Sequence, residues 1–378
     1  MAEKRKTEKT GGAGKPAETQ ANPATFAKAP GFLAGSWERE PVVLSTRVRL
    51  ARNLASLPFP RQASAAQKRE VLESCAKAFA SLPPHKSGTL HDISKLGREE
   101  RTLLVESHLI SKELAEAGDA AVFLSHDQTC SVMINEEDHL RIQVVHGGSR
   151  LAKAWKSANE LDDVLCHAIR FAFSPRLGYL TACPTNLGTG MRASFMLHLP
   201  GLVISGQMER ICRALGTAGI TVRGWLGEGS DAAGSIFQIS NQHTLGHSEK
   251  AISQQLEGWL HEITQQETNA RLRLLESDNL RLFDQISRAF GLLRNAILLT
   301  SAEAMGALSL MRLGCDLGLL PPGLRSTVDR LLIEAQSAHI QSTHDARNSR
   351  AEDSCRAMLI RRKFLQVPEP AFHRLMEL

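Results

Sequence analysis

Residues 135–145 read NEEDHLRIQVV, an acidic turn that leads directly into an alternating strand, and this stretch decides the fold. Leu140 and Ile142 alternate there with Arg141 and Gln143. Successive side chains of a β-strand point to opposite faces of the sheet. The pattern therefore predicts a half-buried strand that holds Arg141 on the face opposite its apolar side chains.

On both sides of this strand, short apolar runs alternate with helical stretches. The strand-like runs are residues 121–124, 131–134, 177–182, 195–199, 220–225 and 236–240, and the helical stretches are residues 64–82, 103–117, 152–173 and 207–215. Ser64 precedes the first helix at the position of an N-cap. The strands arrive in pairs without the regular spacing of βαβ units. The sequence therefore predicts an α+β fold with a mostly antiparallel sheet flanked by helices.

The two ends of the chain differ in composition from the middle. Residues 1–30 are rich in Lys, Glu, Ala, Gly, Pro and Thr, a composition typical of a disordered tail. From about residue 248 onward, long helical stretches follow one another. We therefore predict a disordered N-terminal tail over residues 1–35, an α+β domain over 36–268 and an all-α C-terminal domain over 269–378.

The net charge of +5 does not mark a nucleic-acid-binding domain. Residues 1–30 carry 6 Lys and Arg against 3 Asp and Glu, and residues 270–378 carry 15 against 12. The remaining middle carries 24 against 25, so its net charge is −1. Because the positive charge belongs to the two ends, we expect no nucleic-acid partner.

Membrane-spanning and disulfide-rich classes are disfavoured as well. No run of about 18 apolar residues occurs, and residues 1–30 hold no apolar region of a secretory signal. The seven cysteines contain no CxxC pair, and their odd number argues against a disulfide framework or a zinc site. These features predict a cytoplasmic protein without a membrane segment or a protein-bound metal.

The usual phosphate-binding loops do not occur, and arginines at the ends of predicted strands take their place. There is no G-x-x-x-x-G-K-[ST] motif and no HRD or DFG set. Arginines stand instead beside glycines and short polar residues, at Arg47, Arg49, Arg141, Arg192 and Arg223. A planar guanidinium suits phosphate oxygens, and Arg47 and Arg49 share one face of an extended segment. Several such groups could replace a phosphate-binding loop; the alternative is a set of unrelated surface arginines.

Two acidic loops lie in the same region. Glu137 precedes the strand that carries Arg141, and Glu228 follows the strand that carries Arg223. Carboxylates beside arginines at strand ends are understandable if a cationic substrate completes the charge balance. The alternative is that both loops are ordinary solvated turns.

Four segments together resemble the ATP:guanidino phosphotransferases, which include creatine and arginine kinases. They are residues 45–49 (STRVR), 135–141 (NEEDHLR), 183–190 (CPTNLGTG) and 239–242 (ISNQ). The resemblance is closer still to the bacterial protein-arginine kinases, the McsB branch, through INEEDHLRIQ at 134–143 and FQISNQHTL at 237–245. It covers about residues 41–365. It implies a phosphagen-kinase-like catalytic domain of the glutamine-synthetase-like type, followed by a helical domain.

The resemblance implies a nucleotide site built around the five arginines, with ATP and Mg²⁺ bound there. The residues that match nucleotide-binding positions are Ser45, Thr46, Arg47, Val48, Arg49, His108, Arg141, Arg192, Ala193, Ser194, Phe195, Met196, Arg223, Gly224, Trp225, Leu226 and Gly227. Taken alone, a histidine in a helical stretch such as His108 could equally be an ordinary partly buried residue.

The same resemblance implies a site for a substrate guanidinium. Glu137 and Glu228 match the two carboxylates that hold this group, and Cys183 matches the cysteine beside it. A guanidinium keeps its proton up to a pH of about 12, so phosphoryl transfer onto it needs groups that orient it and take a proton. Glu228 is our first choice for this base and Glu137 our second. Cys183 would polarise the guanidinium as a thiolate without covalent chemistry; its alternative is a plain buried cysteine.

The C-terminal region resembles the family segment that recognises phosphoarginine, whose pattern is Arg-Asp-x-x-Arg-Ala. This chain reads EDSCRA at 352–357, so Asp353 and Arg356 agree with the pattern and Glu352 replaces a cation. Asp353 and Arg356 are therefore candidates for phosphoarginine binding, with a repelling charge beside them. The alternative is an amphipathic helix over residues 352–365 whose apolar side chains pack inward.

We therefore expect a kinase that transfers the γ-phosphoryl of ATP to arginine side chains of proteins and so marks them for degradation. The small helical domain that precedes the catalytic domain of phosphagen kinases has no counterpart here, which favours an open site for protein chains. The alternatives are a kinase of a free guanidino compound, an amidinotransferase or deiminase with a covalent cysteine, and a phosphoarginine-binding adaptor.

The partners are implied by the resemblance alone. They are proteins that present arginine, a small zinc-binding activator protein and a Clp-type protease, in protein quality control and the stress response. We expect a homodimer.

Overall fold

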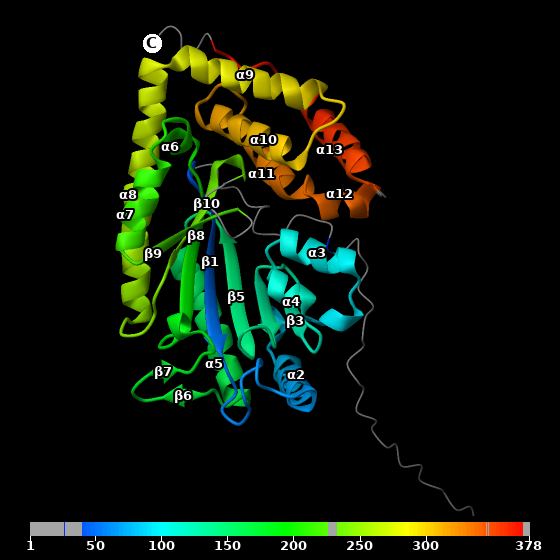
Figure 1. The fold of residues 1–378 in the computed structure, drawn as a ribbon, viewed down its shortest axis with the longest axis vertical. Helices are drawn as coiled ribbons and strands as arrows, with labels where there is room; N and C mark the ends of the chain where they lie inside the picture. The colour runs from blue at the N-terminus through cyan, green and yellow to red at the C-terminus, as the bar shows by residue number, and fades with distance from the viewer. Residues whose placement is uncertain (1–25, 27–39, 226–232, 345, 347, 373–378) are drawn as a thin grey trace, which may run out of the picture.

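One antiparallel sheet of eight strands forms the centre of the N-terminal part of the chain (Figure 1). In spatial order its strands are β2 (Gly88–Asp92), β3 (Ala121–Ser125), β4 (Cys130–Ile134), β5 (Leu140–Gly147), β1 (Val43–Arg52), β8 (Met191–His198), β10 (Ile236–Asn241) and β9 (Ile220–Gly224). Every neighbouring pair is antiparallel. The predicted α+β fold with a mostly antiparallel sheet is confirmed.

The computed structural model describes Phe26 and residues 40–225, 233–344, 346 and 348–372. The predicted site residues Leu226, Gly227 and Glu228 lie outside the described residues, and so does nearly all of the predicted tail. Phe26 is the one tail residue that the structure describes. Its ring is buried against the sheet and meets His91 edge to face, with 5.3 Å between ring centroids.

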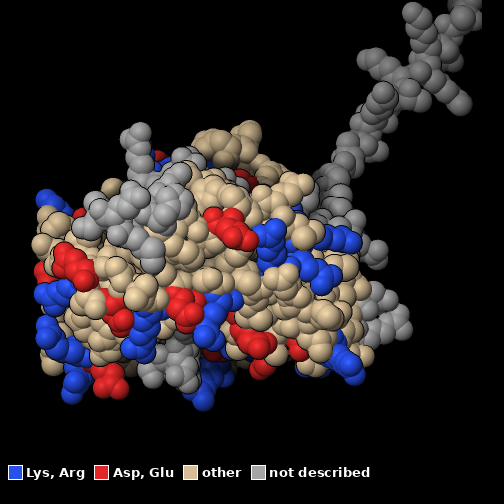
Figure 2. Space-filling model, turned by 90° about the horizontal axis from the view of Figure 1, so that it is seen from above, with Lys and Arg blue, Asp and Glu red and all other residues tan. Residues whose placement is uncertain are grey.

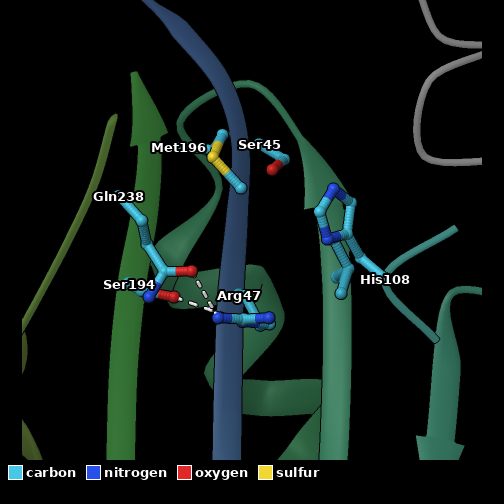
Figure 3. A pocket seen from close by; sticks show the side chains of 7 residues that line it. Ser45, Arg47, His108, Ser194, Met196 and Gln238 are labelled. Atoms are coloured by element: carbon cyan, nitrogen blue, oxygen red, sulfur yellow. Dashed lines mark hydrogen bonds between the residues drawn. The ribbon is translucent and has the colours of Figure 1, made fainter. Parts of the chain in front are cut away.

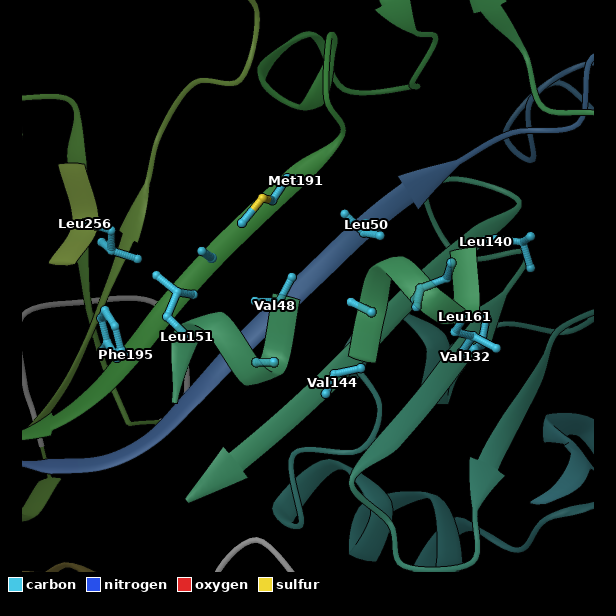
Figure 4. Close-up of a cluster of buried hydrophobic side chains, with 14 of the residues drawn as sticks. Val48, Leu50, Val132, Leu140, Val144, Leu151, Leu161, Met191, Phe195 and Leu256 are labelled. Atoms are coloured by element: carbon cyan, nitrogen blue, oxygen red, sulfur yellow. The ribbon is translucent and has the colours of Figure 1, made fainter. Parts of the chain in front are cut away.

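The two faces of the sheet differ in chemistry because apolar and polar residues alternate along its central strands. On one face, Val48 and Leu50 of β1 and Val144 of β5 are buried beneath α5 (Leu151–Ala168) (Figure 4). Each such buried side chain contributes roughly 1.5–3 kcal/mol to folding. The other face carries the arginines. Burial of the apolar face fixes the strand register, and this register determines that the arginines point to the opposite side.

Helices surround this sheet. They are α2 (Ala65–Ala80), α3 (Arg98–Glu106), α4 (Lys112–Glu116), α6 (Pro200–Ile204), α7 (Met208–Thr217) and α8 (Glu249–Ser277). The predicted cap at Ser64 is confirmed, since its Oγ accepts the backbone N–H of Gln67 and the Gln67 side chain accepts that of Ser64. This reciprocal pair satisfies two of the free N–H groups at the start of α2.

The predicted single helix over residues 103–117 is wrong. Its first part is the end of α3, which stops at Glu106, and the chain then turns at His108, whose φ is 57°. The N–H groups of Leu109 and Ile110 turn back to the carbonyl of Leu104, at 3.0 and 3.3 Å. That geometry is a helix C-terminal cap that only a left-handed residue permits.

Two further boundaries differ from the sequence prediction. The helix predicted over residues 152–173 ends at Ala168, and the strand predicted over 177–182 is reduced to β7 (Gly178–Tyr179), which pairs with β6 (Phe173–Ser174). The residues that follow β7 hold their backbone in place through single bonds, such as the N–H of Leu180 to the carbonyl of Ala172 at 2.9 Å. Apolar content alone therefore overestimated both elements.

The described chain after β10 is helical, as predicted. After α8 come α9 (Asn279–Asn295), α10 (Ser301–Asp316), α11 (Leu324–Glu334), α12 (Ser337–His344) and α13 (Ser349–Phe364). The predicted boundary between residues 268 and 269 falls inside α8, which runs from the side of the sheet up to α9 (Figure 1). One long helix thus belongs to both parts.

The C-terminal helices pack against one end of the sheet's arginine-bearing face. Val145, Met196 and Trp225 share an apolar cluster with Phe283 of α9 and Met305 of α10. Polar side chains therefore occupy the middle of this face, and apolar side chains occupy the end that meets the helices.

Buried ion pairs reinforce this junction. Arg271 of α8 bonds Asp316 of α10 at 3.0 Å, and Arg312 of α10 bonds Asp329 of α11 at 2.8 Å. Arg312 also donates to the carbonyl of Pro41, at 2.6 Å, just before β1 begins. Because a buried charge that loses its partner is costly, these bonds hold the helices and the start of β1 in one arrangement.

The surface shows interspersed charge. On the face that Figure 2 shows, Lys and Arg side chains alternate with Asp and Glu side chains.

Among the described helices, none is long and apolar enough to cross a membrane. All seven cysteines are free thiols.

Candidate active site

The arginine-bearing face of the sheet brings together residues from four strands. In the register of β1 with its neighbours, Arg49 lies opposite Gln143 of β5 and Arg192 of β8, and Arg47 lies opposite Ser194. Directly opposed residues of an antiparallel pair share a face of the sheet. Arg47 and Arg49 therefore point the same way, as predicted, and Arg192 joins them.

The remaining two arginines extend this cluster along the sheet. Arg223 of β9 lies opposite Gln238 of β10, and the Oε1 atom of Gln238 accepts a hydrogen bond from Arg47. Arg141 of β5 lies opposite Ala51, two residues further along β1 than Arg49. We call Arg47, Arg49, Arg141, Arg192 and Arg223 the arginine cluster.

Mutual repulsion and burial perturb the arginine cluster. Burial, followed by the charges of Arg141, Arg192 and Arg223, lowers the pKa of Arg47 to about 10. Burial and the neighbouring arginines also lower the pKa of Arg49 and that of Arg192. A group of cations held together in this way is unfavourable unless an anion joins it.

Unpaired donors show where such an anion would bind. Within the described part of the chain, the buried Nε atoms of Arg49 and Arg192 have no hydrogen-bond partner. Leaving a buried donor unsatisfied costs about 1–3 kcal/mol, so native proteins rarely do so without a function. Guanidinium groups that converge with free donors fit the oxygens of a phosphate chain.

A pocket lies where the arginine cluster meets the apolar end of the face. It is lined by Ser45, Arg47, His108, Val145, Ser194, Met196 and Gln238. Figure 3 shows Arg47 beside Ser194 and Gln238, with the ring of His108 across the pocket. The Nε atom of Arg47 donates to the hydroxyl of Ser194 at 3.4 Å. One side of the pocket is thus cationic, and Val145 and Met196 give the other an apolar wall.

His108 reaches the pocket from the turn after α3. The carbonyl of His108 accepts a hydrogen bond from Gln143 Nε2 at 2.8 Å, and the ring meets Trp225 edge to face, with 4.8 Å between centroids. Its left-handed φ costs on the order of 1 kcal/mol for a residue with a side chain, a strain that is common at functional sites. The turn therefore holds an unusual conformation that aims the imidazole at the pocket.

We expect the His108 imidazole to stay neutral well below its ordinary titration range. Burial, and after it the charge of Arg47, lowers its pKa from 6.5 to about 3. Because the lowered pKa favours the neutral ring, His108 would stay uncharged at every pH above about 4. NMR titration of the histidine protons, with His108→Gln to assign the signal, measures this. A His108 signal that titrates near pH 6.5 would contradict the arrangement.

The acidic turn between β4 and β5 lies at the far end of the arginine cluster. Arg141 bonds Glu136 at 2.7 Å and Glu137 at 3.3 Å, and Glu136 also accepts the hydroxyl of Ser111. The Glu136 side chain is 3% exposed and that of Glu137 is 45% exposed. Glu136 therefore orients Arg141, whereas the Glu137 carboxylate remains accessible to a substrate.

The predicted substrate residues Glu137 and Cys183 both act electrostatically on Arg192. Burial is the main cause of the lowered pKa of Arg192, and Arg223 lowers it further, whereas Cys183 and Glu137 act in the opposite sense. Burial raises the pKa of Glu137, against the effect of Arg141. The thiol of Cys183 lies 3.0 Å from the hydroxyl of Thr185. Glu137 and Cys183 thus share one charged neighbour in the arginine cluster.

Asp138 connects the acidic turn to the segment that carries Cys183. Its Oδ1 atom accepts the backbone N–H of Ala182 at 2.7 Å and the side-chain amide of Asn53 at 2.6 Å. The same Asn53 accepts the N–H of His139 at 2.9 Å. These bonds fix the position of Cys183 relative to Glu137, although 46 positions separate the two residues in the sequence.

Asp138→Ala is expected to lower kcat by up to about 100-fold with little change in ATP affinity. The reason is that a misplacement of about 1 Å of catalytic groups costs on that order. Steady-state kinetics at saturating ATP measure this. Asp138→Asn keeps an oxygen acceptor at this position, so we expect it to retain more activity. Equal loss in both variants would show that the charge, and not the hydrogen bonds, is required.

The glycine-rich loop before β8 is held by Arg52. This buried arginine pairs with Asp162 of α5 at 2.8 Å and donates to the carbonyl of Thr189 at 3.0 Å. Gly190 has a φ of +66°, and a Cβ atom there would lie 2.6 Å from the carbonyl oxygen of Ala51. Only glycine therefore lets the loop approach β1 closely enough to start β8 with Arg192 in register.

Some of the residues carried over from the family point away from the site. Thr46, Val48, Ala193 and Phe195 are fully buried on the opposite face of the sheet. Thr46 there donates to the carbonyl of Gly148 at 2.5 Å and holds the loop that leads into α5. Only alternate positions of this run aim their side chains at the site, and nucleotide binding by the run stays a prediction. Successive side chains of a strand point to opposite faces of the sheet, so every second residue of the run points away from the site.

Sequence reasoning missed several residues of the site. Gln143 holds the His108 turn, Gln238 bonds Arg47, and Asn53 and Asp138 join the acidic turn to the segment that carries Cys183. Gln143 follows Arg141 at a spacing of two, so the alternation already placed it on the same face. Asn53 carried no such signal.

The predicted phosphoarginine residues lie on α13. Arg356 is 1% exposed and donates to the carbonyls of Ala335 at 2.7 Å and Leu299 at 2.8 Å and to Asp353 at 2.6 Å. Its guanidinium is therefore used to hold α13 against the other helices. Phosphoarginine binding by Asp353 and Arg356 stays a prediction, and a ligand would have to compete with these bonds.

Family comparisons agree with this geometry. Residues 70–270 match the family model described as "ATP:guanido phosphotransferase, C-terminal catalytic domain", and residues 279–375 match "Protein-arginine kinase McsB C-terminal domain". The chain belongs to the ATP:guanido phosphotransferase family. It is therefore an enzyme of the kinase class, and its reaction is the phosphorylation of arginine by ATP.

Curated relatives define the branch. A protein-arginine kinase of Halothermothrix orenii is 43% identical over 313 residues, which cover 82% of this chain and 89% of that protein. One of Clostridium kluyveri is 41% identical over 328 residues, covering 85% and 94%. One of Brevibacillus brevis is 42% identical over 341 residues, covering 88% and 94%. With these relatives the chain forms the protein-arginine kinase branch of the family.

Solved structures support the same fold. A duplicated taurocyamine kinase from Schistosoma mansoni with bound transition-state-analogue components superposes with a TM-score of 0.57 and 26% identity, over 67% of this chain and 36% of that one. The crystal structure of a lombricine kinase superposes with a TM-score of 0.55 and 27% identity, over 67% and 72%. The chain spans about a third of the duplicated kinase's length. The phosphagen-kinase-like catalytic fold is confirmed.

Proposed function

We propose that this protein transfers the γ-phosphoryl group of ATP to arginine side chains of other proteins. The observation that carries the proposal is the arginine cluster with its unpaired buried Nε donors, which ends at the accessible carboxylate of Glu137. A phosphate chain on this cluster would point its terminal group toward Glu137. The curated relatives named protein-arginine kinase supply the acceptor class.

Each part of the nucleotide would contact a different part of the site. The apolar wall of Val145 and Met196, with the neutral ring of His108, would hold the adenine end. The arginine cluster would hold the phosphates and stabilise the negative charge of the transferring group. Within the described residues, no group of three or more His, Cys, Asp or Glu side chains could hold a metal. Mg²⁺ would enter with ATP, because phosphate oxygens are ligands that it prefers.

The acceptor needs orientation and a base. In the proposed step, a guanidinium nitrogen attacks the γ-phosphorus, a P–N bond forms, and the bond from that phosphorus to the β,γ-bridging oxygen breaks to release ADP. The proton of the attacking nitrogen goes to a carboxylate. The accessible carboxylate of Glu137, 3.3 Å from Arg141, supports Glu137 as this base. Glu228, our first choice from the sequence, lies outside the described residues and stays a prediction.

Mass spectrometry of a protein substrate tests the acceptor. Casein and free arginine are each incubated with labelled ATP and Mg²⁺, and the products are analysed under conditions that preserve acid-labile P–N bonds. We expect phosphoarginine in casein. Turnover of free arginine alone would refute the protein substrate and favour a kinase of a free guanidino compound. Citrulline formed without ATP would favour a deiminase, and ATP left intact would favour a phosphoarginine-binding adaptor.

Cys183→Ser is expected to retain part of the kinase activity. The proposed role of Cys183 is to polarise the guanidinium, and its thiol already shares a short contact with Thr185, so a hydroxyl can occupy the same place. Phosphorylation rates of this variant measure the effect. Complete loss, together with a covalent substrate adduct on the unmodified enzyme, would contradict a non-covalent role.

The proposed cellular role rests on membership of the protein-arginine kinase branch. We propose that arginine phosphorylation marks proteins for a Clp-type protease in the cytoplasm, as part of protein quality control and the stress response. A small zinc-binding protein would activate the kinase, and the enzyme would act as a homodimer. Pull-down of the tagged protein from its own cells, followed by identification of bound proteins, tests these partners.

A further inference from the structure

We propose that Glu106 and His339 form a positioning pair through which the C-terminal helices set the affinity for ATP. Neither residue lines the pocket. Glu106 is the last residue of α3, and His339 lies in the first turn of α12, two elements that lie against each other (Figure 1). The proposal rests on the nucleotide site described above and adds to it a residue pair outside the pocket.

Glu106 is bound by α12 through three hydrogen bonds. Its carboxylate accepts the backbone N–H of Ala338 at 2.9 Å, the backbone N–H of His339 at 3.2 Å and the His339 Nδ1 atom at 2.8 Å. The first N–H groups of a helix have no partner within the helix, and a carboxylate satisfies them with favourable charge. A side chain of the catalytic part therefore caps a helix of the C-terminal part.

The same contact continues to the next residue of the turn. The hydroxyl of Ser107, which is 1% exposed, lies 3.4 Å from His339 Nε2. The residue after it is His108, which holds a left-handed φ of 57° and lines the pocket. His339 thus contacts the two residues that directly precede the pocket histidine.

His108 is consequently held from two sides. From the sheet, Gln143 bonds its carbonyl oxygen, and from the C-terminal part α12 binds the two residues before it. A strained turn persists only when its surroundings hold it in place. Loss of either support would let the turn relax and move the ring away from the nucleotide.

The start of α12 is itself fixed by α13. Arg356 donates to the carbonyl of Ala335 at 2.7 Å and lies 3.4 Å from the hydroxyl of Ser337, the first residue of α12. Gln341 of α12 also donates to Glu352 of α13, at 2.6 Å. A contiguous set of contacts therefore runs from α13 through α12 to Glu106 and Ser107, the two residues before His108. A shift of α12 would move the turn that carries the pocket histidine.

Equilibrium binding of ATP to the full chain tests the proposal. Isothermal titration with MgATP is carried out on Glu106→Ala and His339→Gln, each alone and combined with His108→Ala. We expect the dissociation constant to rise about 2- to 30-fold in each single variant, the range that coupling through packed residues produces. In the His108→Ala background the same changes should have no further effect, because their action passes through that ring.

Glu303→Ala is the matched control. Glu303 caps the start of α10 by bonding the N–H and hydroxyl of Thr300, at 2.9 and 2.6 Å, and it makes no bond to the turn at His108. Its loss should lower the unfolding temperature much as the loss of Glu106 does, while ATP affinity stays unchanged. An effect on affinity in the control as large as in Glu106→Ala would overturn the proposal.

Two other outcomes also overturn it. One is an unchanged dissociation constant in both Glu106→Ala and His339→Gln, and the other is an effect that persists undiminished in the His108→Ala background. Because binding is measured without a phosphate acceptor, the result is independent of the proposed protein substrate. A wild-type chain that binds MgATP but leaves casein unmodified would refute the protein substrate while the positioning test still gives its answer.

Discussion

Arg49→Ala is expected to lower kcat/KM for phosphoryl transfer by about 1,000-fold or more. Arg49 stands at the centre of the arginine cluster, opposite Arg192, and its buried Nε donor is unpaired among the described residues. Arginines that stabilise a transferring phosphoryl group contribute about 10³–10⁵ to the rate of other phosphotransferases. The loss should appear in both kcat and ATP affinity, because the group would hold the phosphates before and during transfer.

Initial rates of protein phosphorylation, with separate titration of ATP, check this. Arg288→Ala is the control, since Arg288 is an exposed arginine of α9 that pairs with Asp284 of its own helix. A loss of less than tenfold in Arg49→Ala would contradict the role of the cluster.

The stability of the fold should change in the opposite direction. Burial and the charges of its neighbours lower the pKa of Arg49, so the charged form is disfavoured in the folded protein. Arg49→Met keeps the apolar length of the side chain and removes the repulsion. We expect this variant to be inactive and yet more stable, by about 1 kcal/mol in the free energy of unfolding. Chemical denaturation of the nucleotide-free protein measures it.

Glu137→Gln is expected to lower kcat by about 10²–10⁴-fold and to leave ATP affinity nearly unchanged. Glu137 would orient the guanidinium and take its proton, and a general base contributes a factor of that size. Its pKa is raised by burial, although Arg141 opposes this. A base must be deprotonated to act, so kcat falls as the pH drops through this raised pKa. The acid limb should therefore lie at a higher pH than an ordinary glutamate would give.

The pH profile of the wild type against that of Glu137→Gln isolates this group. We expect the acid limb to disappear in the variant while its residual rate stays flat. Glu160→Gln serves as control, because Glu160 is a surface residue that pairs with Lys86 far from the cluster. A variant that keeps the wild-type limb would assign the base to another carboxylate, with Glu228 as the first candidate.

Arg49→Ala and Glu137→Gln test the two halves of the site separately. Arg49→Ala affects the donor half of the site and Glu137→Gln the acceptor half, with Arg141 between them through its bonds to Glu136 and Glu137. Binding of ATP to each variant separates the halves experimentally.

Much of the fold could be predicted from alternation along short stretches. The period of two in residues 140–145 placed Arg141 on the polar face, and the same rule placed Arg47 and Arg49 together. The helix over residues 103–117 failed because apolar content continued across a turn that depends on backbone bonds to Leu104. The runs carried over from the family include residues whose side chains face the core, such as Thr46 and Val48, and resemblance alone did not show this.

The sequence by itself determined most of the strands, the face that carries charge and the residues that match a guanidino kinase, because these depend on spacing within a few positions. Only the tertiary structure decided which arginines are paired within the protein and which keep a donor without a partner among the described residues. Arg52 is paired with Asp162, 110 positions away, and Arg356 is bound to backbone carbonyls, whereas Arg49 keeps a free donor. The side chains are identical in chemistry. Their burial and their partners come from segments far apart in the chain, and these alone separate a structural cation from one available to phosphate.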